Sequence, residues 1–114
     1  MAKAPDVAKA FTGRWRIVEM DILDEDDLYL VEEPHILFKG ATEGEIAFGA
    51  LQGTLNTRYT SRDGAPCAEF SWEGFEEGDL VSGRGWAVIS TADRLVGHFY
   101  THNGDDSGFV CERA

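Results

Sequence analysis

Apolar and polar residues alternate along most of the chain after residue 12, with the two-residue period of β-strands. Gly, Asp, Asn and Pro interrupt the alternation at intervals, and these residues favour turns. We predict eight strands, over residues 13–20, 35–40, 45–53, 54–61, 66–74, 83–90, 94–102 and 107–113. The clearest hairpin signal is Asp63-Gly64, because this pair accepts the positive φ angles of a tight turn.

A helical pattern follows the first strand. Asp24 is a suitable N-cap, and three acidic residues after it would lie in the first turn, near the positive end of the helix dipole. We expect Leu28, Leu30 and Val31 to form the buried side and Pro34 to end the segment. Residues 1–10 are predicted to form a short helical lead-in.

Several predicted strands carry apolar residues on both faces. In the strand over residues 94–102, for example, the adjacent Phe99 and Tyr100 point to opposite faces. An open sheet with one wet face would alternate more cleanly, whereas eight antiparallel strands can close without leaving an edge. We therefore predict an all-β fold, a small closed up-and-down β-barrel with one short helix after the first strand, in one domain spanning residues 1–114. A β-sandwich is the alternative.

The net charge is −11, with acidic residues spread along the chain. A protein surface that binds nucleic acids or anionic membranes requires clustered Lys and Arg, so neither is an expected partner. A basic protein is a possible partner. The first residues lack the apolar core of a signal peptide, and we expect a cytoplasmic protein. Cys67 and Cys111 should then be free thiols.

His98, Tyr100 and His102 share one face of a predicted strand because they alternate. Aromatic bodies with polar tips suit a pocket, so we expect them to line any cavity in the barrel. Arg84, between two glycines, could add a positive charge there for an anionic ligand, or pair with Glu19. The opposite orientation, with Leu95 and Phe99 inside and the histidines in water, is equally open.

Other polar groups favour structural roles. His98 and His102 would lie about 13 Å apart, too far to share one metal ion, so we expect neither a metal nor another cofactor. Glu69 and Glu73 alternate with Ala68, Phe70 and Trp72. This alternation predicts that the two glutamates face solvent and that the three apolar residues face the core. The acidic run at 24–27 lacks the spacing of a calcium-binding loop.

Phe11-Thr12-Gly13-Arg14-Trp15 resembles the F-x-G-x-W start of the calycin superfamily, which contains the lipocalins and fatty-acid-binding proteins. That resemblance implies a Trp15 at the closed end of the barrel, under an arginine near the end of the chain, which would be Arg113. The chain also resembles a group of small bacterial proteins that share residues 13–20, 82–87 and 104–107. This second resemblance implies no particular activity.

Three functions remain open at this point. The first is non-catalytic binding of a small apolar or weakly anionic molecule in the barrel, which rests mainly on the likeness of fold. The second is a protein-interaction module whose acidic surface binds a basic partner. The third is an enzyme that uses His98, Tyr100 or His102, although no catalytic motif identifies a reaction.

Overall fold

The computed structural model describes residues 6–114 and contains two short helices and eight strands. The helices are α1 (Asp6–Phe11) and α2 (Glu25–Leu28). The strands are β1 (Gly13–Met20), β2 (His35–Lys39), β3 (Glu43–Phe48), β4 (Leu51–Arg62), β5 (Ala65–Glu76), β6 (Asp79–Thr91), β7 (Arg94–Thr101) and β8 (Asp106–Arg113). The first five residues of the predicted lead-in helix lie outside the described residues.

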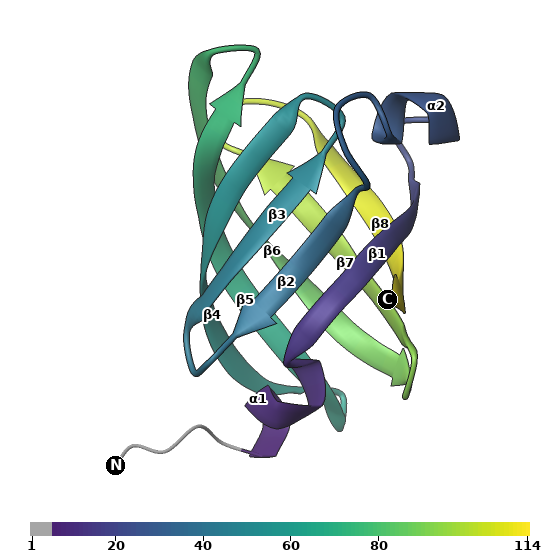
Figure 1. Ribbon diagram of the computed structural model, residues 1–114. Helices are drawn as coiled ribbons and strands as arrows, with labels where there is room; N and C mark the ends of the chain where they lie inside the picture. Colours follow the sequence, from purple (N-terminus) through teal and green to yellow (C-terminus); the bar gives the residue numbers. More distant parts are fainter. Residues whose placement is uncertain (1–5) are drawn as a thin grey trace.

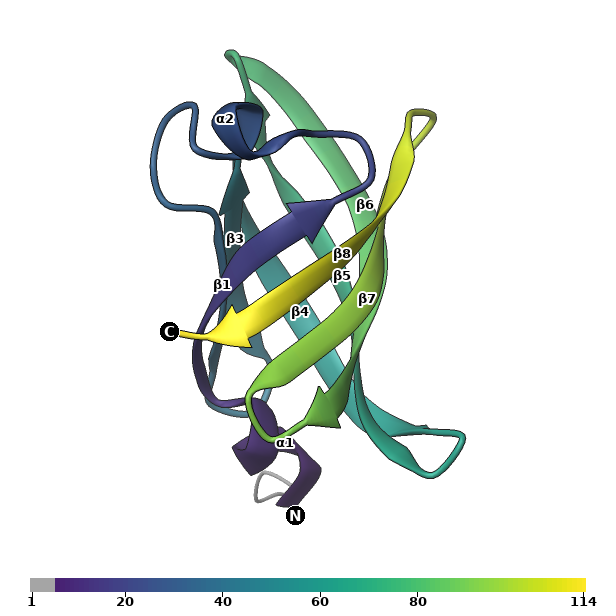
Figure 2. The same cartoon turned by 90° about the vertical axis from the view of Figure 1, so that its right-hand side faces the viewer.

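The eight strands form a closed barrel in which each strand pairs antiparallel with its neighbours in sequence (Figure 1). β1 also pairs with β8, and this seam closes the sheet (Figure 2). The predicted all-β up-and-down barrel is confirmed, and the β-sandwich is excluded. Antiparallel order places the connections alternately at two ends, with α1 at one end and α2 at the other (Figure 1).

Two strand boundaries differ from the prediction. The chain reverses at residues 49–50, inside the segment 45–53 that was predicted to be one strand. The acidic segment after residue 74, which lies between two predicted strands, belongs to β5 and β6, because these strands extend to a tight turn at Glu77 and Gly78, both with positive φ. The predicted turn at Asp63 and Gly64 is confirmed, with φ angles of 51° and 83°.

The helix after β1 is present but shorter than predicted. Its N-cap is Asp24, whose Oδ1 accepts a hydrogen bond of 3.0 Å from the backbone N–H of Asp27. Leu28 is buried as expected, but Leu30 and Val31 are exposed. The helix ends before them, so their side chains are not held against the barrel. Within residues 6–114 no helix has the length and apolar character needed to cross a membrane.

Large side chains fill the inside of the barrel. Aromatic rings from six strands belong to one buried cluster, among them Phe38, Phe70, Trp72, Phe99 and Phe109. Phe11 of α1 is buried at one end, and Leu28 of α2 is buried at the other. Both helices therefore contribute to a packed core, and the hollows described below lie on the outer surface.

Candidate functional site

The four predicted ligand-binding residues lie on the outer wall of β6 and β7. Leu95 and Phe99 are buried, whereas Arg84, Tyr100 and His102 are exposed and His98 is partly exposed. The prediction that these four side chains line the inside of the barrel is therefore corrected in favour of the opposite orientation. The structure also contains no ion pair between Arg84 and Glu19 among its described residues.

The inward positions of β6 and β7 explain this orientation. A Cβ atom on Gly85 would lie 2.7 Å from Cζ of Phe70, and a Cβ on Gly97 would lie 2.7 Å from Cζ of Phe109. Real Cβ atoms do not approach other atoms this closely, so only glycine leaves room for the two rings. The glycines beside Arg84 and His98 thus serve the core, and they turn their neighbours outward.

His98 and Tyr100 pack against each other on the outer wall. Their ring centroids lie 4.7 Å apart, and Nε2 of His98 is hydrogen-bonded to Oδ2 of Asp106 on β8. His102 donates its backbone N–H to the carbonyl of Ser82 at 2.8 Å. Among the described residues no group of three His, Cys, Asp or Glu side chains is arranged to hold a metal ion.

Arg84 and Tyr100 are directly opposite each other across β6 and β7, and both line a hollow of about 630 Å³ on the outer wall. We call this the arginine hollow. Its other charged lining residues are Arg58, Arg62 and Glu69, and its other aromatic lining residues are Phe70 and Trp86. A second hollow of about 500 Å³, which includes His102, adjoins it and shares Arg84 and Tyr100.

The charges in the arginine hollow are unbalanced. Three arginines, Arg58, Arg62 and Arg84, face one carboxylate, Glu69, and none of the three has an ion-pair partner within 4 Å among the described residues. The guanidinium carbon of Arg62 lies 4.2 Å from the centroid of the Trp86 ring. The four other arginines of the chain all have a carboxylate or carbonyl partner.

Sequence reasoning identified Arg84 and Tyr100 but missed Arg58, Arg62 and Trp86. Arg58 and Arg62 lie on β4, and β5 separates them from Arg84. The alternation in residues 55–62 predicts that Arg58 and Arg62 point outward, because Leu55 and Thr57 occupy the buried face of the strand. Their proximity to Arg84 depends on strand register, which the pattern of one strand does not contain.

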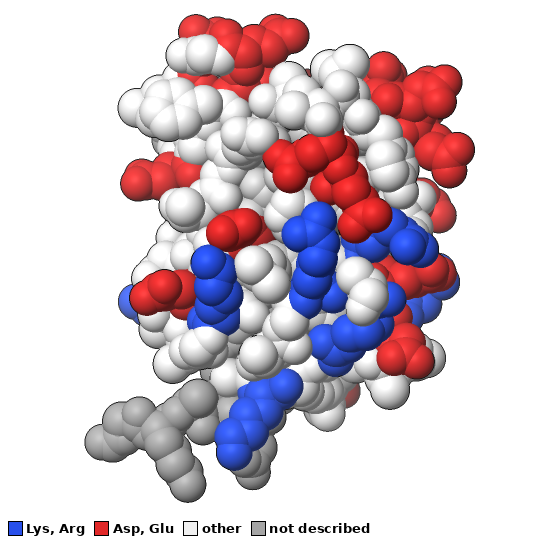
Figure 3. Space-filling view, viewed as in Figure 1, with Lys and Arg blue, Asp and Glu red and all other residues white. Residues whose placement is uncertain are grey.

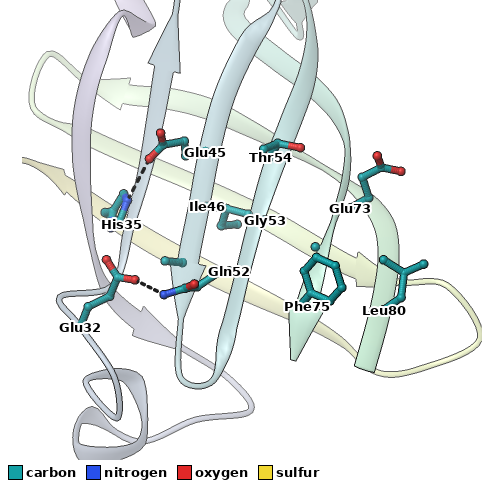
Figure 4. A pocket seen from close by; sticks show the side chains of 12 residues that line it. Glu32, His35, Glu45, Ile46, Gln52, Gly53, Thr54, Glu73, Phe75 and Leu80 are labelled. Atoms are coloured by element: carbon teal, nitrogen blue, oxygen red, sulfur yellow. Dashed lines mark hydrogen bonds and ion pairs between the residues drawn. The ribbon is translucent and has the colours of Figure 1, made fainter. Parts of the chain in front are cut away.

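A third hollow, of about 650 Å³, has the opposite charge (Figure 4). Its charged lining residues are Glu32, Glu45 and Glu73, beside exposed Phe75 and Leu80, and no Lys or Arg lines it. Glu32 accepts a hydrogen bond of 2.7 Å from Nε2 of Gln52. We call this the glutamate hollow.

Other ionisable groups are buried in the core. Burial raises the pKa of Tyr59 to about 12, and its hydroxyl has no hydrogen-bond partner among the described residues. Burial also raises the pKa values of the free thiols Cys67 and Cys111, and the charge of Glu69 contributes at Cys67. Thiols that stay protonated are poor nucleophiles, so neither cysteine has the character of a catalytic residue.

The arginine hollow combines free guanidinium groups with aromatic ring faces. Guanidinium groups bind carboxylates and phosphates through pairs of hydrogen bonds, and ring faces bind flat apolar groups. Its volume lies within the range of about 300–1,000 Å³ that is typical of small-molecule sites. No model of a known protein family, no curated protein and no solved structure matches the chain.

Proposed function

We propose that this protein binds a small, flat organic anion in the arginine hollow, without catalysing a reaction. The observation that carries the proposal is the group of three arginines without ion-pair partners around Trp86 and Tyr100. The chain has a net charge of −11, and a cluster of free positive charge on such a protein attracts an anion locally.

The expected roles follow from the positions of the side chains. Arg84 lies between the two adjoining hollows and would hold the anionic group of the ligand. Tyr100 and Trp86 offer ring surfaces on the two neighbouring strands, β7 and β6. His98 packs on the Tyr100 ring and would keep that ring in place rather than contact the ligand. Of the four residues predicted to line the inside of the barrel, Arg84 and Tyr100 would thus bind the ligand on its outside.

We also propose that the barrel is calycin-like. Support comes from the closed end, where Trp15 is buried and the guanidinium carbon of Arg113 lies 3.8 Å from the centroid of its ring. The short helix α2, between the first two strands, also resembles the arrangement of the fatty-acid-binding proteins. The packed interior favours an external ligand site over binding inside the barrel.

Proton–nitrogen correlation NMR would test the proposed function. We expect naphthalene-2-sulfonate and benzoate to shift the indole N–H signal of Trp86 and the Nε–H signals of Arg62 and Arg84, with saturation. Benzyl alcohol, which lacks the charge, should produce no saturating shift. Trp15 is buried away from this hollow, and its indole N–H donates to the carbonyl of Phe11, so its signal serves as an internal control.

A matched pair of variants sharpens this test. Arg84→Gln should weaken binding about tenfold, which corresponds to one lost charge-assisted hydrogen bond of about 1.4 kcal/mol. Arg94→Gln removes the same charge from an arginine that pairs with Glu112, and it should leave affinity unchanged. Equal effects of the two variants, or no saturable shift with either anion, would contradict the proposal.

A further inference from the structure

The exposed apolar side chains of this barrel gather toward one end. Ile22, Tyr29, Leu30 and Val31 lie in the long β1–β2 connection, and Phe75 and Leu80 flank the β5–β6 turn. Leu80 is 75 % exposed and Leu30 is 64 % exposed. We name this end, formed by residues 21–34, 49–50, 75–80 and 102–106, the acidic end for its charge.

The two apolar groups are linked through the glutamate hollow. Val31 precedes Glu32, whose carboxylate binds Gln52, and Gln52 is the cross-strand neighbour of Phe75. Phe75 is in turn directly opposite Leu80. The β1–β2 connection is itself held in place, because the carbonyl of Leu28 accepts a hydrogen bond of 2.9 Å from Gly49. The exposed apolar side chains of this connection and those of the β5–β6 turn are therefore joined by the polar pair Glu32 and Gln52, which lines the glutamate hollow together with Phe75 and Leu80 (Figure 4).

The charge around this surface is of one sign. The acidic end contains twelve of the 21 Asp and Glu residues and no Lys or Arg. On the face seen in Figure 3, acidic side chains cover the α2 end, and Lys and Arg side chains lie toward the α1 end. Only Glu33 of the twelve is ion-paired with an arginine, and Asp106 is hydrogen-bonded to His98. The remaining carboxylates face solvent without a cationic partner among the described residues.

We propose that the acidic end docks a basic amphipathic segment of a partner protein. The apolar side chains of this segment would cover Phe75, Leu80 and the exposed apolar residues of the β1–β2 connection, and its Lys and Arg side chains would pair with the surrounding carboxylates. The charge selects this occupant, because a second copy of the chain would bring another twelve carboxylates against the first. The surface is separate from the arginine hollow, so the two proposals stand independently.

Peptides with a designed charge and apolar face would test this proposal. The probe is a labelled helical peptide of Leu and Lys, about 14 residues long, or roughly four helical turns. Fluorescence anisotropy should show saturable binding of one peptide per chain, which weakens as salt is added. A peptide with Glu in place of Lys, and another with Ser in place of Leu, should bind at least about tenfold more weakly.

Matched variants locate the surface. Asp79→Lys at the acidic end should weaken binding of the Leu and Lys peptide about tenfold, whereas Asp93→Lys, the same substitution at the opposite end, should not. Phe75→Ser with Leu80→Ser should also weaken it, and both side chains are exposed enough that the fold should survive. The proposal is overturned if Asp79→Lys and Asp93→Lys weaken binding equally, or if the peptide with Ser in place of Leu binds as tightly as the Leu and Lys peptide. It is also overturned if sedimentation shows that the chain is a dimer and that the double Ser variant is a monomer.

Discussion

Arg113 and Trp15 are directly opposite each other across the seam between β8 and β1, and the Arg113 guanidinium lies over the Trp15 indole. Arg113 donates hydrogen bonds to the carbonyls of Ala10 and Thr12, at 3.0 and 3.1 Å, and Trp15 Nε1 donates to Phe11 at 2.9 Å. These two side chains therefore attach the end of α1 to the strands that close the barrel.

Arg113→Met should lower the free energy of unfolding by about 1–3 kcal/mol. The substitution keeps the apolar stem but removes two hydrogen bonds and the cation–π contact. Urea unfolding followed by circular dichroism measures the change. Arg94→Met is the control, since this exposed arginine forms only surface ion pairing and should change stability by less than about 1 kcal/mol. Equal losses in the two variants would contradict the attachment role.

Much of the barrel could be predicted because its turns and strands carry local signals. Asp63-Gly64 and the N-cap Asp24 have side-chain or backbone preferences that act within a few residues. The reversal at residues 49–50 was missed because residues 46–51 read as one apolar run, in which Gly49, with a φ of 55°, is the single turn-favouring residue. The turn at Glu77 was missed because glutamate seldom adopts positive φ.

The candidate site was predicted only in part, because it depends on contacts between strands. Residues on both faces of β7 are aromatic, so its own pattern does not show which face is inside. The facing follows from Gly97, whose missing side chain leaves room for Phe109 on β8. The gathering of Arg58, Arg62 and Arg84 depends on the register across β5, which is a property of the closed sheet.

Gly85→Ala should destabilise the barrel by about 1–3 kcal/mol, the usual cost of overpacking a core. The added methyl would meet Phe70 and also the carbonyl of His98, 2.6 Å away. Combining it with Phe70→Leu should recover part of the loss, because the leucine frees the space nearest the methyl. A double-mutant cycle from urea unfolding measures this coupling. Strictly additive effects would show that the two positions do not compete for the same space.

Cys67 and Cys111 should be unreactive in the folded protein and fully reactive after unfolding. Both are buried free thiols with raised pKa values, and the thiolate is the reactive form. Titration with Ellman's reagent under non-reducing conditions should count two thiols in denaturant, and native protein should react far more slowly. Rapid native reaction, or no free thiol in denaturant, would contradict this assignment.

Tyr59 should make the barrel less stable as the solution becomes strongly alkaline. Burial raises its pKa to about 12 in the folded protein, whereas a tyrosine in the unfolded chain titrates near pH 10. The folded state therefore holds this proton more tightly than the unfolded state. The resulting stability is fully present below about pH 10 and is lost as the pH rises through about 12.

Tyr59→Phe isolates this contribution. The Tyr59 ring packs against Phe11 and Phe38, with centroids 5.5 and 6.2 Å away, and phenylalanine keeps those contacts. Because the hydroxyl is buried without a partner, its removal should leave stability near neutral pH unchanged or raise it by about 1 kcal/mol.

Between about pH 10 and pH 12 the natural chain should lose about 1–2 kcal/mol more of its free energy of unfolding than the variant, after allowance for partial exposure of the ring. Burial also raises the pKa values of Cys67 and Cys111, and their alkaline effects are common to both proteins, so the difference between the two unfolding curves reports Tyr59 alone. Parallel pH profiles for the two proteins would show that Tyr59 titrates as freely in the folded barrel as in the unfolded chain.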